Sequence, residues 1–224
     1  MFNSALFIIM TLISLSFILM AFKLGKHYLI AMIAILTILA NIFVLKGMYL
    51  FGLAATGGNV IYASIFLGTD LLSEYYGKKT ARQAVWVGFF ASMFFLITSQ
   101  FIIRFNPAEY DFAQGALETL FTLAPRIVLG SMLAYLISQN LDVWLFNKIK
   151  NKTGERMLWL RNNASTWISQ LVDSTIFHLI AFWGIFPNLW QLILFVYIVK
   201  IIVATLDTPF IYLSRLTKPN DLTT

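Results

Sequence analysis

The fold is decided by a polar stripe within an apolar segment, Ala164-Ser165-Thr166-Trp167-Ile168-Ser169-Gln170-Leu171-Val172-Asp173-Ser174-Thr175-Ile176-Phe177-His178. The Ser-Gln-x-x-Asp order of Ser169, Gln170 and Asp173 also occurs 31 positions earlier, in Ser138-Gln139-Asn140-Leu141-Asp142. In a helix, side chains three or four positions apart lie within about 60° of one another on one face. Each copy therefore predicts a helix with one polar stripe, and we expect the two stripes to form two walls of one pocket.

The composition places the chain in a membrane. Of its 224 residues, 59% are hydrophobic and only 12% are charged, which is too little polar surface for a soluble domain of this length. The net charge of +6 comes from basic residues in short interhelical loops, where they determine topology, so no nucleic-acid partner is expected. The chain has no Cys, which excludes disulfides and Cys-ligated metals, and we expect neither a metal nor another cofactor.

Seven segments are long and apolar enough to cross about 30 Å of hydrocarbon as helices. They cover residues 4–22, 28–46, 59–76, 83–104, 119–147, 164–185 and 190–213. The first lacks the basic start and the cleavage site of a signal peptide, so we expect it to be retained. The glycine-rich residues 47–59, including Gly52, predict a loop or a re-entrant piece at the outer surface. The expected fold is an all-α polytopic bundle that forms a single transmembrane domain over residues 1–224.

Basic residues indicate which helix ends face the cytoplasm. Most of them follow the first, third, fifth and seventh segments: Lys23, Lys26, Lys78, Lys79, Arg82, Lys148, Lys150, Lys152, Arg156, Arg161, Arg215 and Lys218. The opposite loops carry only Lys46 and Arg104, and the loop after the fourth segment is acidic, with Glu109, Asp111 and Glu118. The positive-inside rule therefore predicts a multi-pass protein of the cell (inner) membrane, with the N-terminus outside and the C-terminus inside.

Charged side chains inside the segments indicate an internal site, because each costs at least about 2.5 kcal/mol unless it faces a bundle interior or a wet cavity. Counting about 1.5 Å per residue from the cytoplasmic basic residues places four side chains at one level, about 12–14 Å in: Asp70, Gln139, Gln170 and Asp207. The same count puts Asn41 and Lys200 about 22 Å in, Asp173 between these layers and Asp142 below both. A polar column through the bundle is expected.

The same residues also have a purely structural explanation. Polar side chains in membrane bundles often only hydrogen bond between helices, at about 0.6 kcal/mol on average, and this explanation is favoured for Ser138, Asn140, Ser169 and Thr205. Four carboxylates and a Lys at related depths favour a site instead. Glu74 lies one turn after Asp70 and one turn before Lys78, so pairing with Lys78 and a role in the site are both compatible with its position. His178 points about 140° away from Asp173, which favours a core histidine.

Several enzyme motifs are missing from the sequence. It has no phosphate-binding Gly-Lys-Ser or Gly-Lys-Thr loop, no His-Glu-x-x-His and no Gly-x-Ser-x-Gly, and its two His are far apart, at His27 and His178. The acidic clusters that hold magnesium on a diphosphate are also absent. An intramembrane enzyme acting on a lipid-linked substrate would have to use isolated Asp residues, and we expect no enzymatic activity.

One stretch resembles a family signature. It reads Ile65-Phe66-Leu67-Gly68-Thr69-Asp70-Leu71-Leu72-Ser73-Glu74-Tyr75-Tyr76-Gly77-Lys78-Lys79, followed by Ala81-Arg82 and Val85-Trp86-Val87-Gly88-Phe89. This run closely resembles the signature of the queuosine precursor transporters, which belong to the vitamin uptake transporter group. Similar motifs follow in the same order: Arg126, residues 134–147, residues 164–183, Lys200 and Pro209. The resemblance covers residues 28–215 as a six-helix core and leaves residues 1–27 as an additional N-terminal span.

The resemblance implies import of a 7-deazaguanine precursor of the tRNA nucleoside queuosine: the 7-cyano base (preQ0), the 7-aminomethyl base (preQ1) or, in some members, queuine. A guanine-like edge has two adjacent N–H donors beside a carbonyl acceptor, so a carboxylate and an amide are complementary to it. Either Asp70 or Asp173 is favoured as the acidic partner, beside Gln139 and Gln170. The remaining expected substrate-binding residues are Asn41, Glu74, Asp142, Lys200 and Asp207, with Trp144, Phe146 and Phe177 for stacking.

Energy coupling and assembly stay open at this stage. The expected partners are the small-molecule ligand and the lipid bilayer, and a homo-oligomer is compatible with the sequence. The chain could act alone as a facilitator or ion-coupled carrier, in which Lys200 with Asp207 or Asp173 forms a protonation switch. It could also be the substrate-binding subunit of an importer driven by a separate ATPase module, which is less favoured because the first span lacks a small-x-x-x-small motif. A purely structural bundle is a further alternative.

Overall fold

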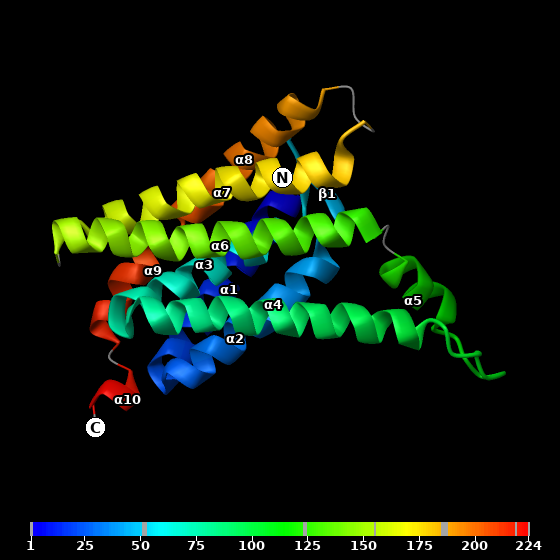
Figure 1. Cartoon of the computed structure of the whole chain (residues 1–224), viewed down its shortest axis with the longest axis horizontal. Coiled ribbons are helices and arrows are strands. Elements are labelled where there is room, and N and C mark those ends of the chain that lie inside the picture. The colour runs from blue at the N-terminus through cyan, green and yellow to red at the C-terminus, as the bar shows by residue number, and fades with distance from the viewer. Residues whose placement is uncertain are drawn as a thin grey trace.

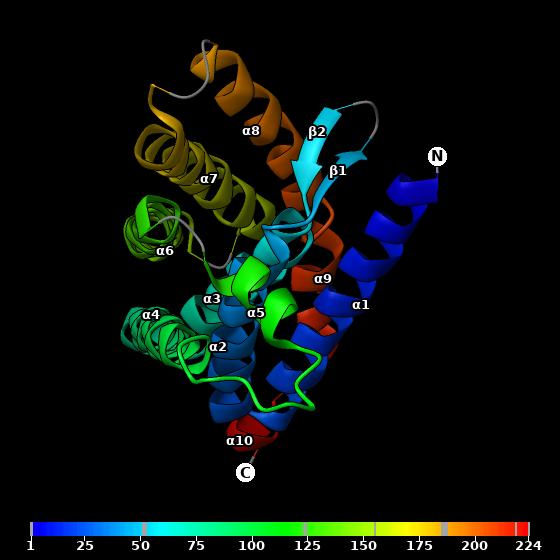
Figure 2. The same ribbon diagram turned by 90° about the vertical axis from the view of Figure 1, so that its right-hand side faces the viewer.

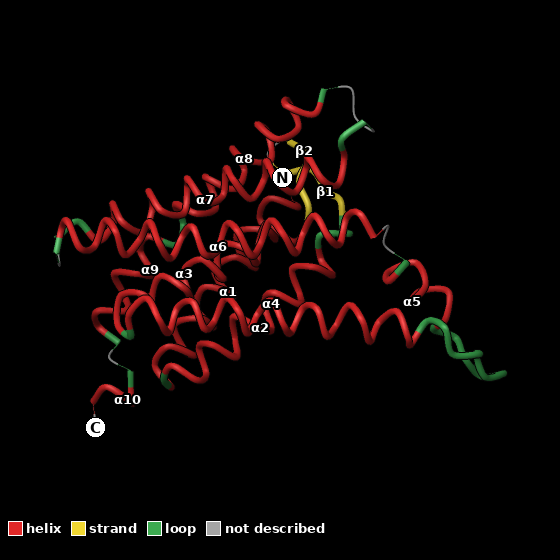
Figure 3. The backbone as a smooth tube through the Cα atoms, viewed as in Figure 1, coloured by secondary structure: helices red, strands yellow, loops and turns green. Residues whose placement is uncertain are grey.

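The computed structural model describes residues 2–50, 53–122, 125–154, 156–184, 188–217 and 219–223. The expectations at Gly52 and Lys218, and any role of the Arg126 side chain, lie outside the described residues. The described chain is nearly all helical (Figures 1 and 3). Its helices are α1 (Phe2–Leu24), α2 (Lys26–Phe43), α3 (Gly58–Tyr75), α4 (Gly77–Ile102), α5 (Gln114–Phe121), α6 (Pro125–Thr153), α7 (Leu158–Phe182), α8 (Leu189–Thr205), α9 (Thr208–Leu213) and α10 (Asn220–Thr223), with a 3₁₀ turn at Ser214–Leu216.

A short β-hairpin is the first difference from the all-α prediction. Residues 47–59 contain the antiparallel strands β1 (Gly47–Leu50) and β2 (Leu53–Thr56), in which Gly47 pairs with Thr56 and Leu50 with Leu53. The prediction of a loop or a re-entrant piece was therefore wrong in its local structure. Strand pairing satisfies backbone N–H and C=O groups that an irregular segment near a bilayer would leave unpaired.

Two predicted spans are interrupted near proline residues. The segment predicted at 119–147 is divided, because α5 ends at Phe121 and α6 begins at Pro125, whose fixed φ and missing N–H suit a helix start. The segment predicted at 190–213 ends its first helix at Thr205, and α9 begins at Thr208 with Pro209 in its first turn. Pro209 cannot donate a backbone hydrogen bond to the preceding turn, so α8 does not continue through it.

The helices differ in how apolar they are. Among the described residues, α1, α2 and α4 are long and apolar enough by themselves to cross a membrane, and α8 contributes a shorter apolar helix. The helices α3, α6 and α7 have 18, 29 and 25 residues, which is long enough at about 1.5 Å per residue to cross most or all of a bilayer core. Buried polar residues lower their hydropathy, as expected of helices that line an interior site.

The helix α3 is the centre of the bundle. It packs against α1, α2, α4, α6 and α8, with smaller contacts to α7 and α9, and its residues 63–73 are all buried. Viewed along the bundle, α1 lies on one side of α3, and α4, α6 and α7 lie on the other (Figure 2). The polar side chains in this part of α3, such as Thr69 and Asp70, therefore lie inside the protein.

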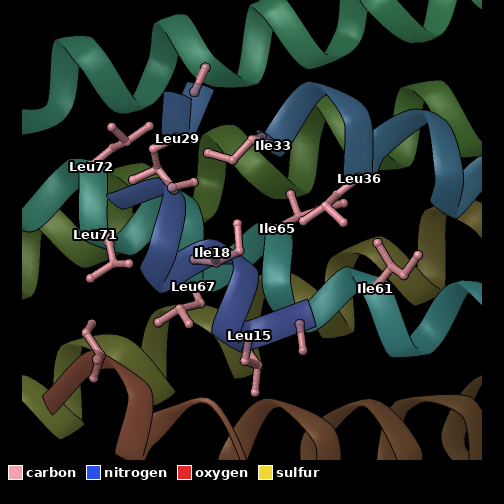
Figure 4. Close-up of a cluster of buried hydrophobic side chains, with 14 of the residues drawn as sticks. Leu15, Ile18, Leu29, Ile33, Leu36, Ile61, Ile65, Leu67, Leu71 and Leu72 are labelled. Atoms are coloured by element: carbon pink, nitrogen blue, oxygen red, sulfur yellow. The ribbon is translucent and has the colours of Figure 1, made fainter. Parts of the chain in front are cut away.

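An apolar core joins α1, α2 and α3 (Figure 4). Leu15 and Ile18 of α1 lie beside Leu29 and Ile33 of α2 and the buried face of α3, and all four are fully buried. Gly68 allows α2 and α3 to approach closely, since a Cβ there would lie 2.8 Å from Ile33 Cγ1. This packing fixes the position of α3 around Gly68.

The helices α6 and α7 form an antiparallel pair that is in contact along most of its length. Figure 1 shows their connection at the same end of the bundle as α9 and α10, whereas α5 lies at the opposite end. The first end is called the basic end here, because it also contains Lys78, Lys79 and Arg82 at the start of α4. The opposite end, with the hairpin, is called the hairpin end.

Candidate functional site

The two polar stripes face each other across α6 and α7, as the repeat predicts. Ser138 Oγ donates a hydrogen bond to Asp173 Oδ1 (3.1 Å), and Ser169 Oγ donates one to Asp142 Oδ1 (3.0 Å). Each Ser therefore binds the Asp of the other copy, and all four side chains are buried. The prediction of a single pocket does not hold, because Asp173 lines a cavity and Asp142 lies in a separate buried cluster. Because α6 and α7 are antiparallel, Asp142 lies nearer the end where the two helices are connected and Asp173 lies farther from it.

The cavity beside Asp173 has a volume of about 360 Å³. Its walls come from α2, α3, α6, α7, α8 and the end of β2, and they extend from Val44 and Thr56 at the hairpin end to Asp173 and Lys200 in the bundle interior. The volume is within the range of about 300–1,000 Å³ that is typical of small-molecule sites. The cavity can therefore admit a small polar ligand from the hairpin end.

A buried ion pair forms the inner wall of the cavity. Lys200 Nζ donates to Asp173 Oδ2 at 2.6 Å, and the two residues are only 7% and 3% exposed. Lys200 Nζ also lies 5.1 Å from the centre of the Tyr62 ring, a cation–π contact. Asp173 is held by Ser138 on its other oxygen. Of the two partners suggested for Lys200, the structure selects Asp173, while Asp207 binds Asn162 instead.

Polar and aromatic side chains surround this ion pair. Asn41 accepts a hydrogen bond from Ser131 Oγ (2.7 Å) and donates one to Ser92 Oγ (3.3 Å), which fixes its amide at the cavity wall. The Phe177 ring also lines the cavity and lies edge-on to His178, with 5.1 Å between ring centres. Charge, amide and aromatic surfaces thus meet in one cavity.

The helical angle of His178 favoured a core residue, but the structure also places it at the cavity wall. It is buried, at 5% exposed, but it also lines the cavity. Its Nδ1 lies 2.7 Å from the Ser174 carbonyl oxygen, so Nδ1 donates this hydrogen bond. The cavity borders a wide arc of α7, which explains why Asp173 and His178 both reach it.

A second polar cluster lies nearer the basic end. Asp70, Asp142 and Asp207 are all 0% exposed, and Asp70 lies close enough to the other two to interact electrostatically. Asp207 Oδ1 accepts a hydrogen bond from Asn162 Nδ2 (2.7 Å). Gln139 Oε1 accepts one from Thr69 (3.3 Å), the neighbour of Asp70. The side chains of this set, called the acidic cluster below, do not line the cavity.

Counting from Lys148 placed Asp142 slightly below the other carboxylates, and this depth stays a prediction. A side-chain interaction between Asp142 and Asp70 is compatible with a difference of about one residue to one turn in height. Arg161, treated as a loop residue, is 0% exposed. Gln170 is also buried, at 2% exposed, and lies outside the cavity lining.

An ion cluster closes the basic end, formed by Glu74, Arg161 and Lys150. Glu74 Oε1 accepts from Arg161 Nη2, and Lys150 Nζ lies 3.2 Å from Glu74 Oε2. Arg161 Nη1 donates to the carbonyl oxygens of Gly154 (2.9 Å) and Arg156 (3.0 Å), which ties the α6–α7 connection to α3. Glu74 therefore pairs with Lys150 and Arg161, which lie on other helices and far away in the sequence. The sequence had suggested Lys78 as its partner.

Two of the aromatic candidates lie away from the cavity. Trp144 is 39% exposed, with Lys148 Nζ 4.4 Å from its ring centre, which is typical of a residue at the protein surface. Phe146 is fully buried in the apolar core, with the Arg161 guanidinium 5.7 Å from its ring centre. Of the three predicted stacking residues, only Phe177 lines the cavity.

Sequence reasoning missed Tyr62, Ser131 and Asn162. Asn162 stands seven positions before Ser169, so it lies on the same helical stripe, and extending that stripe would have found it. Tyr62 and Ser131 carry no such signal, because an isolated Tyr or Ser in an apolar segment is common.

Comparisons with known proteins agree on one family. Residues 56–214 match the model of the family described as "Putative vitamin uptake transporter". The chain is 41% identical over 225 residues to a protein of Bacillus subtilis named "Probable queuosine precursor transporter", an alignment that covers 99% of this chain and 98% of that one. It is 32% identical over 134 residues to the "Queuosine precursor transporter" of Escherichia coli, covering 59% of this chain and 57% of that one. No solved structure matches the chain.

Proposed function

This chain belongs to the vitamin uptake transporter family and is similar along its whole length to a queuosine precursor transporter, and from that premise we propose that it imports 7-deazaguanine precursors of queuosine. The proposed substrates are preQ0 and preQ1, with queuine as a third candidate. The observation that carries the proposal is the cavity of about 360 Å³ whose inner wall is the Asp173–Lys200 ion pair.

The proposed topology has seven spans, α1 to α4 and α6 to α8, in the cell (inner) membrane. The arrangement of charge supports it, because Lys23, Lys79, Arg82 and Lys148 are exposed at helix ends that the positive-inside rule assigns to the cytoplasm. In this orientation the basic end and both α9 and α10 face the cytoplasm (Figure 1). The cavity then faces the outside, and the Glu74–Arg161–Lys150 ion cluster closes the cytoplasmic end. Such a state is ready to accept a substrate from outside.

The chemistry of the cavity suits the guanine edge of the substrate. We propose that Asp173 accepts hydrogen bonds from the ring N–H and the exocyclic amino group, while Lys200 donates to the carbonyl oxygen. The two side chains are 2.6 Å apart and present an acceptor beside a donor, the pattern that this edge requires. Asp173 is favoured over Asp70 as the acidic partner because Asp70 is 0% exposed and lies outside the cavity lining.

The flat faces of the base need apolar partners as well. Phe177 and Tyr62 line the cavity and offer ring surfaces for stacking. Asn41, held by Ser92 and Ser131, is an amide that can bind a polar ring substituent. These residues complete the proposed substrate site, and no enzymatic step or separate ATPase module is part of the proposal.

The test is uptake of labelled preQ0 into cells that cannot synthesise queuosine precursors. We expect cells with this protein to accumulate label and to form queuosine in tRNA at low external preQ0. Asp173→Asn should reduce uptake about 10- to 100-fold, since a hydrogen bond to a charged group contributes about 1.5–3 kcal/mol. The matched control is Asp111→Asn in the exposed outer loop, which should transport normally.

Two results would count against the proposal. Absence of uptake above the empty-vector level, with the protein present in the membrane, would reject the transport function. Equal uptake by wild type and Asp173→Asn would keep the function but reject this site. Comparable amounts of each variant in purified membranes are required for either conclusion.

A further inference from the structure

We propose that Asp70, Asp142 and Asp207 form a proton-binding cluster that couples import to proton uptake. The proposal rests on the proposed transport function and assigns a separate role to the acidic cluster. A proton from the outer solution adds to one carboxylate oxygen and is released to the cytoplasm after the basic end opens. Only an O–H bond forms and breaks in this cycle.

The charge inventory of the described residues requires a positive charge at this position. Asp70 is faced by Asp142 from α6, by Asp207 from the α8–α9 junction and by Glu74 from its own helix. No ion pair joins the described Lys and Arg residues to this cluster, because they pair elsewhere or lie toward an end of the bundle. Lys150 and Arg161 pair with Glu74, and Lys200 pairs with Asp173. On the elements packed around α3, His178 is buried but lines the cavity and binds the Ser174 carbonyl oxygen. The others there are partly or fully exposed: Lys23, Lys26, His27, Lys78, Lys79, Arg82, Lys148 and Lys152.

Ser169 and Asn162 each donate to one carboxylate oxygen of the cluster, but four other carboxylate oxygens have no donor among the described residues. Asp70 and Asp142 are within hydrogen-bonding reach of each other, yet two ionised carboxylates have no proton to share. Both oxygens of Asp70, and Oδ2 of Asp142 and of Asp207, have no partner among the described residues. A single proton between Asp70 and Asp142 would supply the missing donor, as in other pairs of carboxyl groups that share one site.

An independent side chain points to the same conclusion. Asn162 reaches into the cluster, where its Nδ2 donates to Asp207, and its own Oδ1 is buried without a partner in the described chain. Buried acceptors without donors are costly, so a site with this excess of acceptors favours uptake of positive charge.

The size of the cluster distinguishes its ligand from the imported base. Asp70, Asp142 and Asp207 are 0% exposed and do not line the cavity, so they leave no room for a bicyclic ring. Within the described residues, no three acidic or His side chains are placed to hold a metal ion. A proton fits both observations.

The position of the cluster links the cavity to the closed end. On α6, Asp142 lies one turn from Ser138, which binds Asp173 at the cavity wall. On α3, Asp70 lies one turn from Glu74, which binds Arg161 and Lys150 at the basic end. Occupancy of the cavity and opening of the basic end can both act on the cluster through these two helices.

The experiment uses purified full-length protein in liposomes that contain a pH-sensitive dye, with tritiated preQ0 as the probe. For wild type, an acidic outer solution should drive accumulation, by about tenfold for each pH unit if one proton accompanies each base. Adding preQ0 without a gradient should acidify the liposome interior. Asp70→Asn should retain exchange of labelled for unlabelled preQ0 but lose both the accumulation and the acidification. Asp111→Asn is the matched control and should behave as wild type.

Each outcome has a separate meaning. If wild type shows neither uptake nor exchange, the proposed function fails. If wild type exchanges preQ0 but accumulates it independently of pH, or only with a sodium gradient and without acidification, the proton proposal is overturned and the function stands. If Asp70→Asn keeps full coupling, the cluster is not the site. Asp142→Asn is the second variant, and loss of exchange in both would assign these residues to structure and also overturn the proposal.

Discussion

Arg161 illustrates how much a single buried charge can depend on one partner. It is fully buried, and its only described charged contact is with Glu74, while two carbonyl oxygens accept its remaining hydrogen bonds. Removing the charge of the partner leaves a buried cation beside neutral acceptors, which is destabilising. At the residue scale, this ion cluster is therefore expected to contribute to stability as well as to close the basic end.

The corresponding prediction concerns Glu74→Gln. The substitution should lower the free energy of unfolding by about 1–3 kcal/mol, because the buried Arg161 loses its counter-charge. Thermal unfolding of the purified protein in detergent measures the effect. Glu109→Gln, in the exposed outer loop, is the matched control and should change stability by less than about 0.5 kcal/mol. Equal effects of the two substitutions would show that the ion cluster does not stabilise the fold.

The sequence predicts part of this site and misses part of it for a physical reason. The repeated Ser-Gln-x-x-Asp pattern fixes which helical face is polar, so the contacts Ser138–Asp173 and Ser169–Asp142 follow from helical geometry. Helical position does not reveal which neighbour a side chain meets. For that reason the contacts of Tyr62 with Lys200 and of Arg161 with Glu74 became apparent only in three dimensions.

At the element scale, the crossing of α2 and α3 depends on Gly68. A Cβ at this position would lie 2.8 Å from Ile33 Cγ1 and 3.0 Å from Ile33 Cδ1. Gly68→Ala should therefore destabilise the protein by about 1–3 kcal/mol despite the higher helix propensity of Ala. Gly115→Ala in α5, where nothing lies within 4 Å, is the control and should be neutral or stabilising. Unfolding curves that rank the two variants in the opposite order would reject this packing account.

The C-terminal helix α10 is fastened by one acidic side chain. Asp221 accepts hydrogen bonds from the Lys26 backbone N–H (3.0 Å) and the Tyr76 hydroxyl. Burial acts to raise the pKa of Asp221, but the hydrogen bonds from Tyr76 and Lys26 outweigh it and hold the pKa below its usual value. These contacts join α10 to the α1–α2 and α3–α4 turns.

This arrangement predicts an acid-sensitive attachment. Because the pKa of Asp221 is lowered in the folded protein, its contribution is present above the unfolded-state pKa of about 3.9 and is lost as the pH falls through the folded-state value. The protection of the amides of residues 220–223 against hydrogen exchange, taken relative to their intrinsic rates at the same pH, should fall in acid. In Asp221→Ala this protection should be low at every pH, and full protection in that variant would contradict the role of the carboxylate.

Element boundaries were predictable to different degrees. The apolar helices α1, α2 and α4 follow from length and hydropathy alone, since their outer faces are covered by lipid in the expected setting. The breaks before Pro125 and at Pro209 were missed because each proline lies between two apolar stretches, which were counted as one span. The hairpin at 47–56 was missed because its short strands carry no clear alternation of polar and apolar residues.

At the scale of the whole molecule, the structure has a cavity reaching the hairpin end and a closed basic end. This asymmetry predicts which residues a membrane-impermeant maleimide can reach, and the chain has no Cys that would interfere. Val196 lines the cavity, so in the proposed orientation Val196→Cys should be labelled from outside the cell. Ser73→Cys, fully buried beside the ion cluster, should resist labelling from both sides.

The same experiment tests the closure at the basic end. In inverted membrane vesicles, adding Glu74→Gln to Ser73→Cys should increase labelling severalfold, because the ion cluster then holds α3 less firmly. Glu109→Gln in the same background is the control and should leave Ser73→Cys protected. Strong labelling of Ser73→Cys from the cytoplasmic side without any second substitution would contradict the closed state.

The most direct test of the central claim is equilibrium binding of tritiated preQ0 to the purified protein. Wild type should bind one base per chain in competition with unlabelled preQ0, and Asp173→Asn should bind at least about tenfold more weakly, since it loses a charged acceptor. Asp111→Asn should bind as wild type. Undiminished binding by a folded Asp173→Asn protein, or no saturable binding by wild type, would contradict the assignment of the cavity as the substrate site.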